Sequence, residues 1–94
     1  MVKSLHTPAY AAFRRLMADA RERQGLTQAE LATRLGKPQS FVSKYESGER
    51  RLDVVEFVLV CEALGVEATA LFESVLRESH EHKPSHQSRK RTPQ

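Results

Sequence analysis

The chain has 94 residues, 39% of them hydrophobic, which is enough for one small core and too little for two domains. Its formal net charge is +3, and no stretch approaches the roughly 18 consecutive apolar residues that a membrane span needs. The first residues lack the apolar run of a secretory signal, so we expect a soluble, cytoplasmic protein with no membrane partner.

The charges are distributed unevenly along the chain. Residues 1–51 carry ten Lys and Arg against five Asp and Glu, a net charge of +5. Residues 52–82 carry one Arg against seven acidic residues, a net charge of −6, and the last twelve residues add +4. This division predicts a basic half suited to docking on a polyanion and an acidic half directed away from it.

A first helix is predicted over about residues 8–24. Thr7 supplies an N-cap hydroxyl ahead of Pro8, and Gly25 is typical of a residue that ends a helix. Apolar residues recur between them at spacings of three or four, namely Tyr10, Phe13, Leu16 or Met17, and Ala20.

Two short helices follow in close succession. Thr27 and Glu30 have the spacing of a capping box, and Gly36 ends this second helix after about eight residues. The third helix begins near Pro38 and ends at Gly48. The tight turn between them forces a steep crossing angle, which is typical of a helix-turn-helix.

The third helix has one apolar side and one polar side. At about 100° per residue, the core side consists of Pro38, Val42 and Tyr45. The polar residues comprise Gln39, Ser40, Ser43 and Lys44. Amide, hydroxyl and ammonium groups match the base edges of the DNA major groove, which admits one helix, so these four are the candidate base contacts. Phe41 either leans onto the second helix or offers its ring to a ligand surface such as a thymine methyl group.

A fourth helix opens with the capping-box pair Asp53 and Glu56 and ends at Gly65. It is apolar around nearly its whole circumference, so we expect it to be buried on nearly every side, with a second chain covering what this small domain leaves open. The expected dimer interface consists of Val54, Phe57, Val60, Cys61 and Leu64. The single cysteine excludes an internal disulfide and is expected to fill core space, the alternative being a redox or intermolecular role.

A fifth helix over about residues 68–79 is expected to pack beside the fourth through a stripe of Leu71, Phe72, Val75 and Leu76. These helices define a domain over residues 8–79, preceded by an arm at 1–7. The tail at 80–94 has no aliphatic or aromatic side chain and is predicted to be disordered. Its three histidines lack a fixed geometry, so no metal is expected. Its basic run is either solvated or contacts DNA phosphates non-specifically.

The segment LTQAELATRLGKPQSFVSKYESGERRLDV resembles the Cro/phage-repressor type of helix-turn-helix, also called the xenobiotic-response-element family. The resemblance covers about residues 10–78, and its strongest marks are LTQAELA, Gly36 and YESG. It implies an all-α, five-helix, lambda-repressor-like domain that binds operator DNA, usually as a two-fold dimer.

The resemblance also implies roles for individual residues. Gln28 matches a phosphate-holding glutamine, and the base-facing positions of the recognition helix match Gln39, Ser40 and Lys44. Loop positions along the DNA backbone match Arg50 and, less closely, Lys37 and Arg51, for which a solvated charge is the alternative. Arg21 and Glu46 match an ion pair between the first and third helices. The family often has a polar cap where this chain has Pro38, so the start of the third helix is open.

The leading hypothesis is a sequence-specific DNA-binding transcriptional regulator that acts as a homodimer on a palindromic operator. The alternative is an antitoxin or adaptor whose main role is to bind a partner protein. No nucleophile, base and acid assemble in the pattern, no Cys and His set has metal spacing, and no glycine-rich phosphate loop is present. We therefore expect neither an enzyme nor a cofactor.

Overall fold

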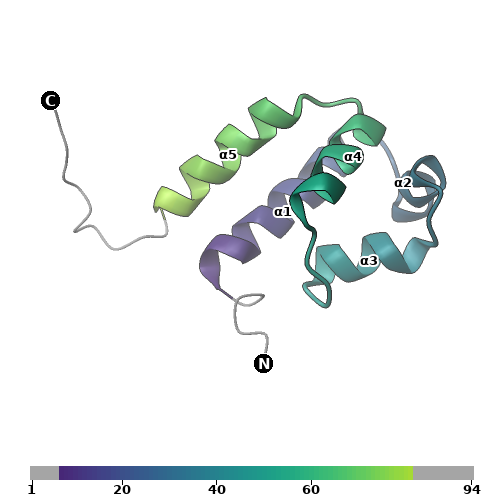
Figure 1. Cartoon of the computed structure of the whole chain (residues 1–94), viewed down its shortest axis with the longest axis horizontal. Coiled ribbons are helices and arrows are strands. Elements are labelled where there is room, and N and C mark those ends of the chain that lie inside the picture. Colours follow the sequence, from purple (N-terminus) through teal and green to yellow (C-terminus); the bar gives the residue numbers. More distant parts are fainter. Residues whose placement is uncertain (1–6, 82–94) are drawn as a thin grey trace, which may run out of the picture.

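Five helices build the part of the chain that can be described. The computed structural model describes residues 7–81, and the side chains of residues 7–78. The helices are α1 (Pro8–Arg23), α2 (Gln28–Leu35), α3 (Gln39–Ser47), α4 (Val54–Leu64) and α5 (Ala68–Glu81). Within residues 7–81 no strand is present, and Figure 1 shows α2 and α3 together at one end of the molecule. The predicted all-α fold is confirmed.

Capping chemistry sets the helix boundaries as the sequence predicted. The Thr7 hydroxyl accepts the amide of Tyr10 at 3.1 Å, and the capping boxes that begin at Thr27 and Asp53 are both formed. The predicted helix ends all have positive φ and are Gly25, Gly36, Gly48 and Gly65.

The prediction that Pro38 faces the core is wrong. Pro38 precedes α3 as an extended N-cap residue with φ −71° and ψ 157°, makes no side-chain cap, and is exposed. Because it lies outside the helix, the 100° periodicity that places Val42 and Tyr45 inward does not apply to it.

One apolar side of α4 is buried in the core, and the other side of that helix is exposed. Its buried residues follow the spacing i, i+3, i+4 and i+7 and are Phe57, Val60, Cys61 and Leu64. These four were expected at the dimer interface. That expectation is wrong, because the chain's own helices already cover them.

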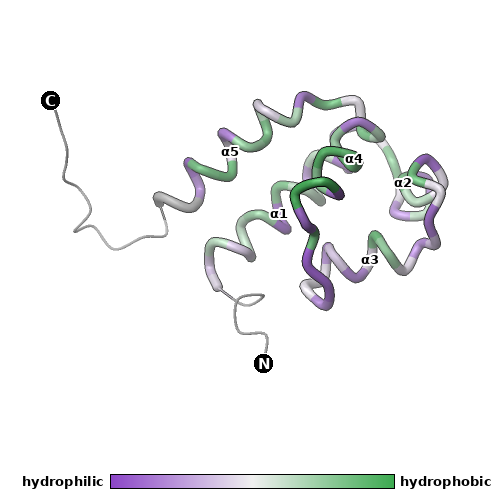
Figure 2. Tube along the Cα trace, in the orientation of Figure 1, coloured by the Kyte–Doolittle hydropathy of each residue, from purple (hydrophilic) through white to green (hydrophobic). Residues whose placement is uncertain are grey.

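The opposite side of α4 is apolar and open. It presents Val54 and Val55 at 73% and 64% exposure, followed by Val58 and Leu59 at 39% and 50%. Figure 2 shows α4 as the most continuously hydrophobic helix. Of the five residues expected at a subunit contact, only Val54 lies on this outer face.

α5 contacts α4, as predicted, but it packs mainly along α1, which was not predicted. The Arg15 guanidinium donates to the Glu78 carboxylate at 3.0 Å across the α1–α5 contact. This placement leaves Phe72 and Leu76 about half exposed. The helix runs to Glu81, two residues beyond the expected domain boundary, and the remaining tail lies outside the described residues. Among the helices described, none is long and apolar enough to cross a membrane.

The start of α4 is tied to the loop before it by a two-pronged ion pair. Arg50 donates from Nη1 and Nη2 to the two carboxylate oxygens of Glu56, at 3.0 and 2.8 Å. The amide of Asp53 donates to the same carboxylate at 3.0 Å. The Arg50 hydrogen bonds first, and the Asp53 amide second, lower the pKa of Glu56 to about 2.

Acid is expected to remove the stabilisation that ionised Glu56 provides. Its pKa falls from 4.5 to about 2 on folding, so the contribution is complete above about pH 4.5 and is lost as the pH falls toward 2. Glu56→Gln keeps an acceptor for the Asp53 amide but lacks the charge, and is expected to lower the free energy of unfolding by about 1 kcal/mol at pH 7. Urea titrations of both proteins between pH 7 and pH 3 measure this gap. A gap that stays constant over that range contradicts the assignment.

Candidate nucleic-acid interface

The recognition helix α3 is anchored on one side and open on the other. Val42 and Tyr45 are 0% and 1% exposed in the core. The polar face carries Gln39, Ser40 and Lys44, all exposed, and the described part of the chain offers their side chains no hydrogen bond or ion pair. Ser43 is partly exposed, and its hydroxyl donates to the carbonyl of Ser40 at 3.3 Å. The polar groups that the sequence singled out therefore share one accessible surface.

A shielded carboxylate at Glu46 joins the helices that hold this surface. Arg21 donates from Nε and Nη2 to the two carboxylate oxygens at 2.8 and 3.0 Å, and from Nη1 to the carbonyl of Leu26 at 2.7 Å. The two side chains are only 10% and 7% exposed. The hydrogen bonds to Glu46 raise the pKa of Arg21, so its guanidinium stays charged. The ion pair that the resemblance implied is therefore formed.

Gln28 is part of the same network, which the sequence did not indicate. Its Nε2 donates to the Glu46 carboxylate at 2.9 Å. A glutamine amide has a second N–H and a carbonyl oxygen, so one donor remains for a phosphate. Glu46 thus orients the side chain that the resemblance assigns to the DNA backbone.

The loop cations are braced within the chain. Arg50 is bound to Glu56, and its guanidinium carbon lies 4.8 Å from the centroid of the Phe41 ring. The guanidinium of Arg51 lies 5.5 Å from the ring centroid of Tyr10. Arg50 is therefore bound within the chain while its side chain stays 40% exposed, and the phosphate contact expected of it stays a prediction.

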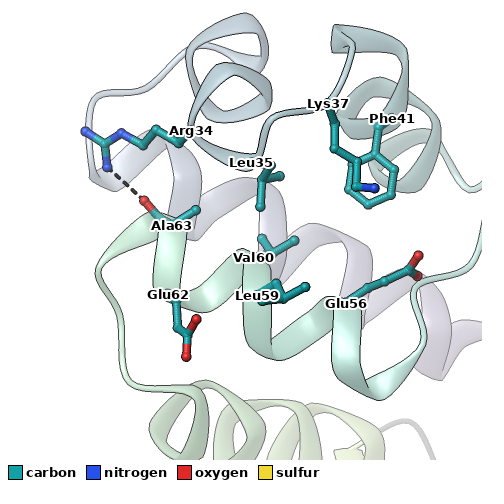
Figure 3. Close-up of a pocket in the computed structure, with 9 residues that line it drawn as sticks. All are labelled: Arg34, Leu35, Lys37, Phe41, Glu56, Leu59, Val60, Glu62 and Ala63. Atoms are coloured by element: carbon teal, nitrogen blue, oxygen red, sulfur yellow. Dashed lines mark hydrogen bonds between the residues drawn. The ribbon is translucent and has the colours of Figure 1, made fainter.

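The Phe41 side chain points from the recognition helix toward the interior side of the domain, not toward the polar face. Figure 3 shows its ring directed toward α4, with the amino group of Lys37 alongside at 5.3 Å from the ring centroid. The ring also meets Tyr45 edge-on, with centroids 5.5 Å apart. It lines a hollow of about 340 Å³ between α2, α3 and α4, bordered by Leu35 and Leu59. The ring therefore lies away from the polar face, where a thymine methyl group would be met.

Arg14 is a functional candidate that the sequence analysis missed. Its Nη1 donates to the backbone carbonyl of Glu46 at 3.0 Å, near the end of α3. The available signal was its position seven residues before Arg21, which places both on one face of α1.

Metal chemistry has no evident site in the described part of the chain, where no group of three or more His, Cys, Asp or Glu side chains is arranged to hold an ion. The histidines and the basic run of the tail lie outside the side chains described. Burial raises the pKa of the Cys61 thiol to about 11, as expected for a cysteine that fills core space.

Comparisons with known proteins agree on one family. A family model described as Helix-turn-helix matches residues 17–71. An XRE-family like protein from Pseudomonas syringae pv. tomato str. DC3000 has 47% sequence identity and a TM-score of 0.73, over 81% of this chain and 93% of that one. No curated protein matches the sequence significantly.

Two mutant structures of the restriction-modification controller protein C.Esp1396I share the fold at 22% and 23% identity, both with a TM-score of 0.72. They cover 79% and 82% of this chain and 99% and 98% of their own. The chain belongs to the XRE family of helix-turn-helix proteins. It is a DNA-binding protein of the transcription-regulator class.

Removing the carboxylate at the centre of the network is expected to be severe. Glu46→Ala leaves the shielded Arg21 charge with only the exposed carboxylate of Glu22, 3.7 Å from its Nη2, which costs about 3 kcal/mol of unfolding free energy. Denaturant unfolding followed by circular dichroism measures this loss. Glu49→Ala, an exposed acidic position on the next loop, is the matched control and is expected to change stability by less than about 0.5 kcal/mol. Similar losses in the two variants contradict the role of Glu46.

Proposed function

We propose that this protein is a sequence-specific transcriptional regulator that binds a palindromic operator as a homodimer. The observation that carries the proposal is the outward polar face of α3, backed by buried Val42 and Tyr45 and held by Glu46. A helix presented in this way suits insertion into the major groove, whose base edges offer both donors and acceptors. Such a regulator would act in the cytoplasm, by binding rather than catalysis.

Base reading and phosphate binding fall to different side chains. Lys44 suits guanine, Gln39 suits adenine, and Ser40 and Ser43 suit either. Phosphate contacts are assigned to Gln28, Lys37 and Arg51, with Arg50 contributing to the field while it remains bound to Glu56. The phosphate contacts supply most of the affinity and the α3 side chains supply the choice of sequence.

The interface of the proposed homodimer is the exposed apolar surface of α4 and α5. Its members are Val54, Val55, Val58, Leu59, Phe72 and Leu76. An open groove of about 860 Å³ between α1, α4 and α5 is lined by four of them, Val54, Val58, Phe72 and Leu76, and by Tyr10 and Phe13 among others. A two-fold dimer would place this apolar surface against the same surface of a second chain. Exposed apolar patches of this kind mark interaction sites in small proteins.

Lys44→Ala is expected to relax the preference at one base pair of each half-site, at a cost of about 1 to 3 kcal/mol on the best sequence. Gln28→Ala is expected to weaken all duplexes about equally, because phosphates carry no sequence information. Selection from a random DNA pool supplies the operator, and titrations on operator and scrambled duplexes at one salt concentration supply the comparison. Arg23→Ala, which removes a charge from the exposed end of α1, is the control. Equal losses on both duplexes for Lys44→Ala contradict base reading.

Phe72→Glu is expected to convert the dimer to a monomer that remains folded, because this side chain is already 52% exposed in the single chain. Sedimentation equilibrium measures the mass, and circular dichroism measures the fold. Ala70→Glu places the same charge on an exposed position of α5, outside the groove, and is expected to leave the dimer intact. Operator affinity should fall at least about tenfold for Phe72→Glu only, since a monomer grips one half-site.

The alternative role as an antitoxin or adaptor rests on the same apolar surface. A wild-type protein that is monomeric, and becomes soluble only when produced with a partner protein, favours this role over the homodimeric regulator. A dimer that selects a palindrome favours the regulator.

A further inference from the structure

Two arginines on one face of α1 hold a single residue of the recognition helix. Arg14 and Arg21 are seven residues apart, which is about two turns or roughly 10 Å along the helix axis. Arg21 binds the Glu46 carboxylate, whereas Arg14 Nη1 donates to the backbone carbonyl of Glu46 at 3.0 Å. The side chain and the main chain of Glu46 are therefore anchored separately.

Arg14 also fits closely against the glycine that ends α3. Gly48 is buried and has φ +91°, and a Cβ atom there would lie 3.1 Å from Arg14 Nε and 3.2 Å from its Cζ. The amides of Gly48, Glu49 and Arg50 all donate to the carbonyl of Lys44, at 3.1, 2.9 and 3.2 Å. The guanidinium of Arg14 thus packs against the turn that closes the recognition helix.

Filling the space beside Gly48 does not by itself require a charged arginine side chain. The Nε of Arg14 is buried and has no hydrogen-bond partner within the described residues, which is a cost that an apolar side chain would avoid. A cation at a helix C-terminus also complements the partial negative charge of its last carbonyls.

We infer that Arg14 is a positioning residue for DNA recognition, one that sets the orientation of α3 and of the turn after it. The inference rests on the proposed function. Buried Val42 and Tyr45 and the Glu46 carboxylate hold this nine-residue helix through its side chains, and the bond from Arg14 to the Glu46 carbonyl adds a restraint on its main chain near the C-terminal end. Because base contacts tolerate little misplacement and phosphate contacts tolerate more, losing the second anchor should reduce sequence preference more than general affinity.

The test compares Arg14→Met with Arg15→Met on the selected operator and on a scrambled duplex. Both variants remove one positive charge from α1, but Arg15 is exposed and bound to Glu78 on α5, away from α3. The operator-to-scrambled affinity ratio is expected to fall about fivefold to tenfold for Arg14→Met, as for one lost hydrogen bond, and to stay within about twofold of wild type for Arg15→Met. Equal ratios for the two variants overturn the inference. A wild-type protein with no preferred duplex instead overturns the proposed function.

A second readout needs no DNA. Hydrogen exchange at the amides of Gly48, Glu49 and Arg50 is expected to be at least about fivefold faster in Arg14→Met than in Arg15→Met. Arg14→Lys keeps the charge and lacks the planar guanidinium, so it serves if Arg14→Met fails to fold. It is expected to show the same two changes at reduced size, and wild-type exchange together with a wild-type affinity ratio overturns the inference.

Discussion

A shielded carboxylate that must remain paired is the constraint on which this molecule depends. The Glu46 side chain is only 7% exposed, and a carboxylate in that position is tolerated only with close counter-charges and donors. Arg21 from α1 and Gln28 from α2 supply them, so the need to satisfy one residue of α3 sets how three helices meet. The crossing of α2 and α3 presents a polar helix face to the outside. The placement of the polar face of α3 thus depends on an internal electrostatic requirement.

The two ends of the domain have opposite surface chemistry. At one end α3 exposes amide, hydroxyl and ammonium groups, and the charge of the first half of the chain is positive. On the other side α4 and α5 expose valine, leucine and phenylalanine among acidic residues. The polar face of α3 and the apolar surface of α4 and α5 are therefore separate surfaces of one small domain.

Much of the candidate site could be predicted, because its residues are set by local rules or by family resemblance. Val42 and Tyr45 follow from helical periodicity, and the Arg21–Glu46 pair follows from the resemblance. The binding of Arg50 to Glu56, and the turn of Phe41 toward α4, could not be predicted in the same way. Each depends on where a neighbouring helix or loop lies after folding. A cation in a loop has the same sequence signature whether it meets a phosphate, water or a carboxylate of its own chain.

The sequence by itself determined the helices and their ends. Thr27 and Asp53 begin helices through hydrogen bonds that span three residues, and glycines end them through a left-handed conformation, so no distant contact is needed. Only the tertiary structure decided which side of α4 is buried, because a helix that is apolar all round carries no record of its partners. For the same reason, the apolar side of α5 did not predict that this helix packs mainly along α1. The hydrogen bonds at a helix end join residues that are close in the sequence, so the sequence predicts them. Burial depends on which faces of different helices pack together in the folded chain.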